Sequence, residues 1–216
     1  MVKEIELKAH VRDSETLKNR LSGKAVYSCA FEKRDVYWFG QETGVFPVTK
    51  LRVRKEKRSF AGGTEKTLCL VTYKAKEVNN GVEMNDELEF EVCPVEAFEE
   101  FLEKAGLKPG AVKRKRGWAF TKAVSFAAEL AAAELCAELV EVDSLGWFIE
   151  LEICVNVSGD DADDKHEETF SEARETLLAF LDSLGVEREA IERRFYLDML
   201  SSVDQRTEDI EQKTDN

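Results

Sequence analysis

The sequence predicts an α+β protein built on an antiparallel sheet or barrel whose charged face points inward. Strand-like segments fill most of the first two thirds of the chain, whereas helical patterns are interspersed and gather at the end. In the strand-like segments, large apolar residues alternate with charged ones. Side chains alternate between the two faces of a strand, so helices would cover the apolar face and the charged face would line an interior.

The composition is that of one globular domain. The chain has 216 residues, of which 43% are hydrophobic and 35% are charged, and no linker divides it. The net charge of −13 argues against a nucleic-acid partner, because phosphate backbones are bound by basic faces. We expect one domain over residues 1–200 and a polar, disordered tail over residues 201–216.

The cysteines and the N-terminus indicate a cytoplasmic protein. The five cysteines are scattered and form no C-x-x-C pair, which is typical of reduced thiols. His10 and His166 add too few ligands for a zinc site, and His10 is expected at a strand end on the surface. The N-terminus lacks the apolar stretch of a signal peptide, and no apolar run is long enough for a membrane span.

The strands are predicted by alternation and bounded by turn residues. A first strand is followed by a short helix over residues 13–21, which Asp13 begins and Gly23 ends. Turns are expected at 41–47, 59–64 and 79–81. The predicted strands cover residues 2–10, 35–39, 51–55, 68–76, 87–92, 112–120 and 148–157.

Three further helices and one ambiguous segment complete the pattern. Pro94 begins a helix that Gly106 ends, and helices over 169–184 and 187–200 are separated by Gly185. Residues 123–139 are rich in alanine, which favours helix, although both neighbours are strand-like. We expect a helical or loop-like insertion there.

Six of the strands carry like charges two residues apart. Each strand carries one sign, unlike the mixed charges of a solvated face. Like charges at this spacing repel each other unless an opposite charge or an ion lies between them. The acidic strands carry Glu4 and Glu6; Glu87, Glu89 and Glu91; and Glu150 and Glu152. The basic strands carry Arg52 and Arg54; Lys74 and Lys76; and Lys113 and Lys115.

A solvated outer face is one explanation of any single strand in this set. The whole set is better explained by a tunnel for a linear, highly charged anion. Carboxylates would hold divalent cations, and arginine and lysine would bind phosphates.

The motifs resemble, in order, those of the CYTH superfamily, the triphosphate tunnel metalloenzymes, over roughly residues 2–200. The layout is most similar to the bacterial class IV adenylate cyclase-like branch. The matching segments are Glu4-Ile-Glu-Leu-Lys8, Asp35-Val-Tyr-Trp38, Leu51-Arg-Val-Arg54, Tyr73-Lys-Ala-Lys76, Glu87-Leu-Glu-Phe-Glu91, Leu145-Gly-Trp-Phe-Ile-Glu-Leu-Glu152 and Tyr196-Leu-Asp-Met-Leu200.

The resemblance implies an eight-stranded antiparallel tunnel with helices outside, an Mg²⁺ or Mn²⁺ cofactor and, as in many members, a homodimer. Members act on ATP, thiamine triphosphate or inorganic triphosphate. Lys8 would lie near the reacting phosphates. The implied metal ligands are Glu4, Glu6, Glu89, Glu150 and Glu152. The implied phosphate ligands are Arg52, Arg54, Lys74, Lys76, Lys113 and Lys115.

One position departs from the family pattern. The motif L-D-x-V becomes Leu139-Val-Glu-Val142, so Val140 replaces the aspartate. Glu138, two residues earlier on the same face, is the candidate substitute in catalysis. Three functions stay open. We favour a class IV adenylate cyclase, which converts ATP to cyclic AMP and pyrophosphate; the alternatives are a triphosphatase and a non-catalytic module that binds polyphosphate or nucleotide.

Overall fold

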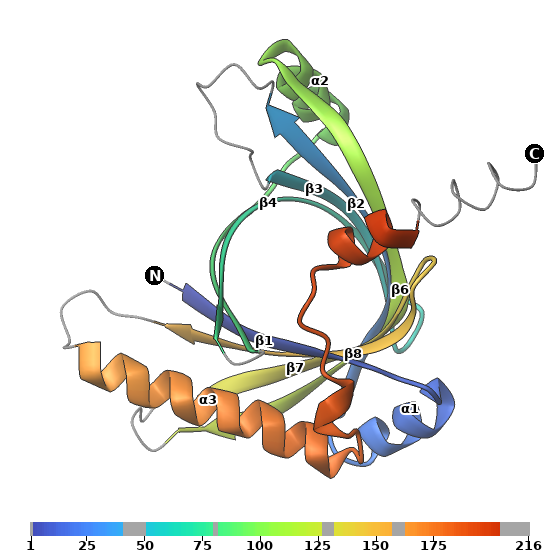
Figure 1. Cartoon of the computed structure of the whole chain (residues 1–216). Helices are drawn as coiled ribbons and strands as arrows, with labels where there is room; N and C mark the ends of the chain where they lie inside the picture. Colours follow the sequence, from blue (N-terminus) through green and yellow to red (C-terminus); the bar gives the residue numbers. More distant parts are fainter. Residues whose placement is uncertain (1, 41–50, 80–81, 127–131, 157–162, 204–216) are drawn as a thin grey trace, which may run out of the picture.

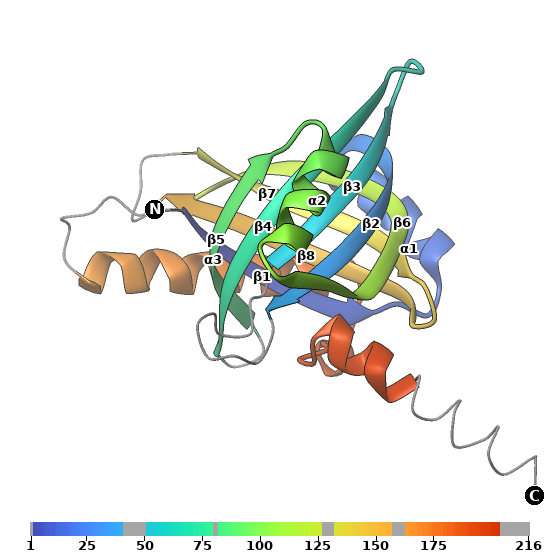
Figure 2. The same ribbon diagram turned by 90° about the horizontal axis from the view of Figure 1, so that it is seen from above.

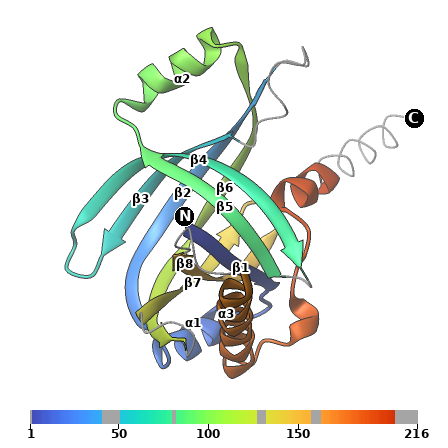
Figure 3. The same cartoon turned by 90° about the vertical axis from the view of Figure 1, so that its left-hand side faces the viewer.

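Eight antiparallel strands close into a barrel in the order β1-β5-β4-β3-β2-β6-β7-β8. This is a computed structural model, and it describes residues 2–40, 51–79, 82–126, 132–156 and 163–203. Figure 1 looks along the barrel, and Figures 2 and 3 show it from two other sides. The predicted α+β tunnel with helices outside is confirmed.

The barrel closes because β1 pairs with both β5 and β8. All neighbouring strands are antiparallel, and their registers place inward side chains of adjacent strands side by side. The strands are β1 (Val2–His10), β2 (Val26–Gly40), β3 (Leu51–Phe60), β4 (Glu65–Asn79), β5 (Val82–Glu91), β6 (Leu107–Ser125), β7 (Ala132–Val142) and β8 (Gly146–Asn156).

The helices lie on the outside of the barrel, with α3 and α2 on opposite sides (Figure 1). They are α1 (Ser14–Ser22), α2 (Val95–Lys104) and α3 (Asp163–Ser183), followed by the 3₁₀ turn η1 (Arg188–Ala190) and a helical stretch at 196–203. None of the helices in the described ranges is long and apolar enough to cross a bilayer.

The main apolar core lies between the outer face of β1, β7 and β8 and the helices α1 and α3. Ile5, Leu7 and Leu151 from the strands pack there with Leu177 and Leu181 of α3, and each is at most 1% exposed. Burying one such side chain contributes about 1.5–3 kcal/mol. The alternate residues of the same strands therefore point into the barrel, as the charge pattern predicted.

The insertion expected at residues 123–139 is wrong. β6 continues through Ser125 and β7 begins at Ala132, while residues 127–131 lie outside the described part of the chain. Leu135, Ala137 and Leu139 are fully buried in the core with the helices, whereas Cys136 and Glu138 line the cavity inside the barrel. Pairing with β6 and β8 on both sides outweighs the helical preference of alanine.

The helix expected at residues 187–200 is also wrong. Only η1 and residues 196–203 are helical. Between them Ile191 forms a bridge with Ala9, and the Glu192 N–H donates to the Lys8 carbonyl at 2.9 Å. The segment crosses one end of the barrel because its backbone hydrogen bonds are made with β1 (Figure 1).

The remaining predicted elements agree with the structure apart from their ends. The first two predicted helices correspond to α1 and α2, and the helix expected at 169–184 begins earlier as α3. β2 and β6 are much longer than predicted, and the turn between β3 and β4 spans residues 61–64. Residues 41–47, residues 80–81 of the turn expected at 79–81 and residues 204–216 of the expected tail lie outside the described residues, whereas residues 201–203, expected to be disordered, are helical.

Candidate active site

The barrel encloses a cavity of about 490 Å³ whose lining is mostly charged. Its walls come from all eight strands, with most of the acidic residues on β1 and β8 and most of the basic residues on β2, β3 and β6. The lining residues are Glu4, Glu6, Lys33, Arg52, Arg54, Glu56, Arg58, Leu70, Glu89, Lys115, Cys136, Glu138, Glu150, Glu152 and Cys154. The structure thus places most of the predicted ligands around one space.

An acidic wall, formed by Glu4, Glu6, Glu150 and Glu152, lines the β1–β8 side of this cavity. Glu6 stands directly opposite Glu152 in the register of the two strands. Burial, together with the charges of Glu4 and Glu6, raises the pKa of Glu152 to about 8. Carboxylates that repel each other in this way favour a proton or a cation between them.

This donor set suits a hard divalent cation, because Mg²⁺ and Mn²⁺ prefer carboxylate oxygens. Across the described ranges, no three Asp, Glu, His or Cys side chains are already gathered in a geometry that would hold a metal ion. A cation at Glu4, Glu6 and Glu152 would relieve the repulsion that raises the pKa of Glu152.

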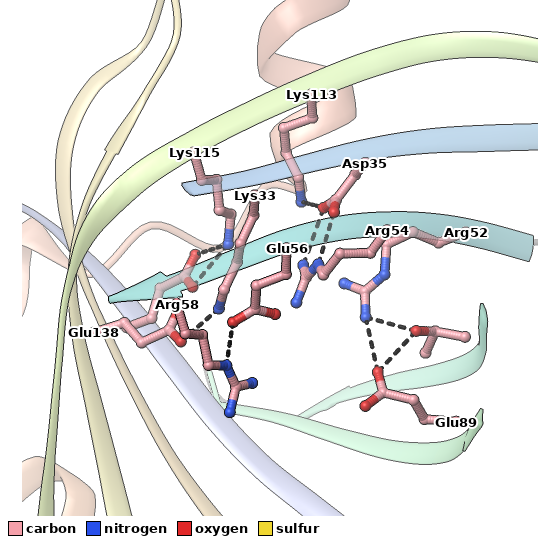
Figure 4. A network of polar contacts seen from close by, with 12 residues as sticks. Lys33, Asp35, Arg52, Arg54, Glu56, Arg58, Glu89, Lys113, Lys115 and Glu138 are labelled. Atoms are coloured by element: carbon pink, nitrogen blue, oxygen red, sulfur yellow. Dashed lines mark hydrogen bonds and ion pairs between the residues drawn. The ribbon is translucent and has the colours of Figure 1, made fainter. Parts of the chain in front are cut away.

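A basic wall is formed by Arg52, Arg54, Lys113 and Lys115 on β3 and β6 (Figure 4). Arg52, Arg54 and Lys115 line the cavity, whereas Lys113 is buried beside them and is not among the lining residues. Arg54 donates two hydrogen bonds to Asp35, at 2.7 and 3.0 Å, and the Lys113 ammonium lies 3.3 Å from the same carboxylate. Burial alone would raise the pKa of Asp35, but Arg54 and Lys113 outweigh it and hold that pKa well below its usual range. Asp35 therefore fixes two members of the basic wall.

Two predicted metal ligands are engaged by predicted phosphate ligands. Lys115 donates to both oxygens of Glu150, at 2.6 and 2.7 Å. Burial would raise the pKa of Glu150, but Lys115 outweighs it and lowers that pKa to about 2. Glu89 accepts a hydrogen bond from Thr72 and lies 3.6 Å from Arg52.

Three charged lining residues were missed by the sequence analysis: Lys33, Glu56 and Arg58. Arg58 donates to Glu56 at 2.6 Å, and Lys33 pairs with Glu138 (Figure 4). Their spacing of two residues from Asp35 and Arg54 was the available signal. This signal was missed because one predicted strand began at residue 35 and the next ended at residue 55. In the structure, β2 begins earlier and β3 ends later.

Lys8 lies beside the segment that crosses the end of the barrel, because its carbonyl accepts a hydrogen bond from the Glu192 N–H, and it is 4% exposed. Its ammonium group is 5.6 Å from the centre of the Tyr196 ring, which also lies 4.8 Å from the ammonium of Lys115. Tyr196 and Met199 pack with inward side chains into an apolar layer at this end. The other members of the layer are Phe31, Val140, Val142 and Phe148.

The position at which the resemblance implies an aspartate therefore lies in apolar surroundings. Val140 is fully buried in this layer. Glu138 lies instead in the charged cavity, where it meets Lys33. The acid available on β7 is thus two residues away from the family position, on the same inner face.

The remaining residues that the sequence analysis singled out are Lys74, Lys76 and His10. Lys74 and Lys76 belong to β4, but their side chains lie outside the described part of the structure. His10 is exposed at the end of β1 and lies 3.0 Å from Glu192. This is the surface position expected for it.

The same fold occurs in several solved structures. A protein from Pyrococcus horikoshii OT3 has a TM-score of 0.67 and 24% identity, over 92% of this chain and 98% of that one. A proposed adenylate cyclase from Vibrio parahaemolyticus has a TM-score of 0.63 and 18% identity, over 92% and 97%. A proposed adenylyl cyclase from Hippeastrum, described as having a dominant triphosphatase activity, has a TM-score of 0.57 and 14% identity, over 94% and 96%.

No family model matches the chain, and no curated protein gives a significant match. The fold is nevertheless that of the proposed adenylate cyclases named above. The class of protein is therefore an eight-stranded tunnel with a charged interior. The eight-stranded tunnel that the motif resemblance implied is therefore the fold that these structures share with the chain.

Proposed function

We propose that the chain is a metal-dependent enzyme that acts on a linear triphosphate. The observation that carries this proposal is the cavity with an acidic wall on one side and a basic wall on the other. A chain of phosphates carries several negative charges in a row, which suits a row of arginines and lysines. The fold shared with proteins proposed to be cyclases supports the same substrate class.

Glu4, Glu6 and Glu152 would hold the metal, and Glu150 and Glu89 are further proposed ligands once their cationic partners are engaged by substrate. A bound Mg²⁺ or Mn²⁺ would supply positive charge that neutralises the phosphates. Arg52, Arg54, Lys113 and Lys115 would bind and orient the phosphate oxygens, and Lys8 would lie at the end of the chain of phosphates. Most of the rate enhancement would come from positioning and charge stabilisation.

The first reaction to consider is cyclisation of ATP. The 3′-oxygen attacks the α-phosphorus in line, a new O–P bond forms, and the bond to pyrophosphate breaks. The hydroxyl proton must be accepted, and Glu138 is the proposed acceptor because its carboxylate faces the cavity. The basic wall would stabilise the negative charge that collects on the departing pyrophosphate.

The second reaction is hydrolysis of a triphosphate in the same cavity. A water oxygen attacks the terminal phosphorus, the bond from that phosphorus to its bridging oxygen breaks, and a water proton passes to solvent. Orthophosphate and the diphosphate part of the substrate are released, with the same phosphate ligands in use. The triphosphatase activity described for the Hippeastrum protein favours keeping this candidate. The inorganic triphosphate would need no contact beyond the two charged walls.

A product analysis separates the candidates. The full chain is incubated with ATP, thiamine triphosphate and tripolyphosphate, each with Mg²⁺ and with Mn²⁺, and all phosphate products are quantified. Cyclic AMP with an equal amount of pyrophosphate from ATP supports the cyclase. Orthophosphate from tripolyphosphate without cyclic nucleotide eliminates the cyclase and supports the hydrolase. Tight binding of tripolyphosphate with no product from any substrate would leave the non-catalytic binding module.

A further inference from the structure

Two lysines and two glutamates form a closed square inside the barrel. Lys33 on β2 stands directly opposite Lys115 on β6, and Glu138 on β7 stands directly opposite Glu150 on β8. Lys33 reaches over β6 to pair with Glu138 (Figure 4), and Lys115 reaches over β7 to pair with Glu150. Each side of the square between directly paired strands joins like charges, and each side that reaches over an intervening strand joins opposite charges.

Like charges directly opposite each other on neighbouring strands repel. The two lysines are each 7% exposed and Glu150 is 8% exposed, so water screens this repulsion little. The crossing ion pairs neutralise the square, but removing such groups from water costs about as much as their attraction returns. Apolar side chains would stabilise the fold at least as well, which indicates that the square serves a ligand.

We propose that Lys33 is a phosphate-binding residue of this tunnel and that Glu138 holds it until a triphosphate binds. This inference rests on the proposed function. An anion placed between Lys33 and Lys115 removes their mutual repulsion, and the phosphate oxygens take over the hydrogen bonds that Glu138 and Glu150 accept. The Glu150 carboxylate released by this exchange then suits the cation that accompanies the triphosphate, and the Glu138 carboxylate is freed for the proton transfer proposed above.

The chain offers a matched control for this residue. Lys33 is held inside the barrel, with its ammonium group 4.3 Å from the centre of the Phe31 ring. The next residue, Arg34, carries the same charge on the same strand but points outward and is exposed. Replacing either residue removes one positive charge, and only the replacement of Lys33 changes the cavity.

The test is calorimetric titration of the full chain with tripolyphosphate, first with a chelator and then with Mg²⁺. We expect Lys33→Met to weaken binding about ten-fold or more in both conditions, because a hydrogen bond to a charged group is lost. Arg34→Met should change the dissociation constant by no more than about two-fold, since its charge is outside and screened. Glu138→Gln should tighten the binding of tripolyphosphate when the chelator is present. In this variant Lys33 no longer has to break an ion pair with a carboxylate before it contacts a phosphate.

Three outcomes would overturn the inference. If the wild type binds tripolyphosphate and Lys33→Met binds it equally well, Lys33 is no phosphate ligand while the proposed function stands. If the wild type binds no tripolyphosphate in either condition, the proposed function and the inference fall together. If circular dichroism shows that Lys33→Met does not fold, the Glu138→Gln variant provides the test instead. An affinity of Glu138→Gln for tripolyphosphate equal to that of the wild type, measured with the chelator, would reject the exchange of partners.

Discussion

Asp35 shows at the scale of single residues how the basic wall is held in place. Its side chain is fully buried and is contacted by Arg54 and Lys113. Neither cation would keep its position in the interior without a carboxylate, because an unpaired buried charge is strongly unfavourable. The acid of the D-x-Y motif therefore acts here through the two cations that it orients.

Asp35→Asn should lower the free energy of unfolding at pH 7 by about 3–5 kcal/mol, since Arg54 and Lys113 lose their charged partner. The pKa of Asp35 is lower in the folded state than in the unfolded chain, where it is about 3.9. Its contribution is therefore fully present above about pH 4 and is lost as the pH falls through the folded pKa. Urea unfolding at pH 7, 5 and 3 should show the gap between wild type and variant narrowing only at the lowest pH. A gap that stays constant would contradict this.

The carboxylates of the acidic wall should behave differently from Asp35. Glu4→Ala or Glu6→Ala should reduce metal-dependent turnover about 100-fold or more, because a metal supplies several kcal/mol of charge stabilisation. The fold should stay intact, since these side chains face the cavity and not the apolar core. Turnover with Mg²⁺ and Mn²⁺ is measured beside thermal unfolding, with the exposed Glu32→Ala as the control. Loss of the folded state would instead indicate a structural ion pair.

At the scale of elements, β6 and β7 approach each other closely at Gly117. A Cβ atom built at Gly117 would lie 2.0 Å from the carbonyl oxygen of Leu139. Backbone atoms cannot move aside as a flexible side chain can. The absence of a side chain at this position therefore sets the spacing of the two strands that carry Lys115 and Glu138 into the cavity.

Gly117→Ala should therefore destabilise the protein by about 3 kcal/mol, through a clash that only a shift of β7 can relieve. Gly23→Ala is the matched control, because its added Cβ would meet only the Arg20 and Asn19 carbonyl oxygens, at 3.6 and 3.9 Å. Chemical denaturation of both variants gives the comparison. Equal stability of the two variants would show that β6 and β7 can separate freely.

Alternation along the strands was sufficient to predict which face of each strand is charged. Ile5 and Leu7 face the helices while Glu4 and Glu6 face the cavity, as local periodicity alone implies. The alanine-rich residues of β7 could not be assigned in the same way, because their strand conformation depends on pairing with β6 and β8. The segment around Ile191 is set by a bridge to Ala9, which is distant in sequence and leaves no local pattern.

The sequence predicted the kinds of charged residue in the site, but it did not predict which carboxylate pairs with which cation. Arg52, Arg54 and Lys115 were found because their strands carry one sign of charge. Lys33 was not found, because the predicted strand began at Asp35, whereas β2 begins at Val26. Which carboxylate meets which cation depends on the closure of the barrel, so the sequence alone could not pair Lys115 with Glu150.

At the scale of the whole molecule, the pairing of charges inside the barrel would let an acidic chain bind an anion. The chain carries a net charge of −13, yet four of the carboxylates that line the cavity are each paired with a lysine or arginine: Glu56, Glu89, Glu138 and Glu150. Under the proposed function, a triphosphate with its metal ions would bring the same alternation of charge that the cavity makes with its own side chains. Binding would then be an exchange of ion pairs within a closed barrel, and the outer surface would contribute little to it.

The most direct test of this account is a crystal structure of the full chain grown with tripolyphosphate and Mn²⁺, with manganese located by anomalous scattering. We expect the triphosphate inside the barrel against Arg52, Arg54 and Lys115, with manganese beside Glu4, Glu6 and Glu152. The Lys115–Glu150 ion pair should be broken in that structure. Manganese or phosphate found only on the outer surface, with the ion pairs of the cavity unchanged, would contradict the assignment of the tunnel as the active site.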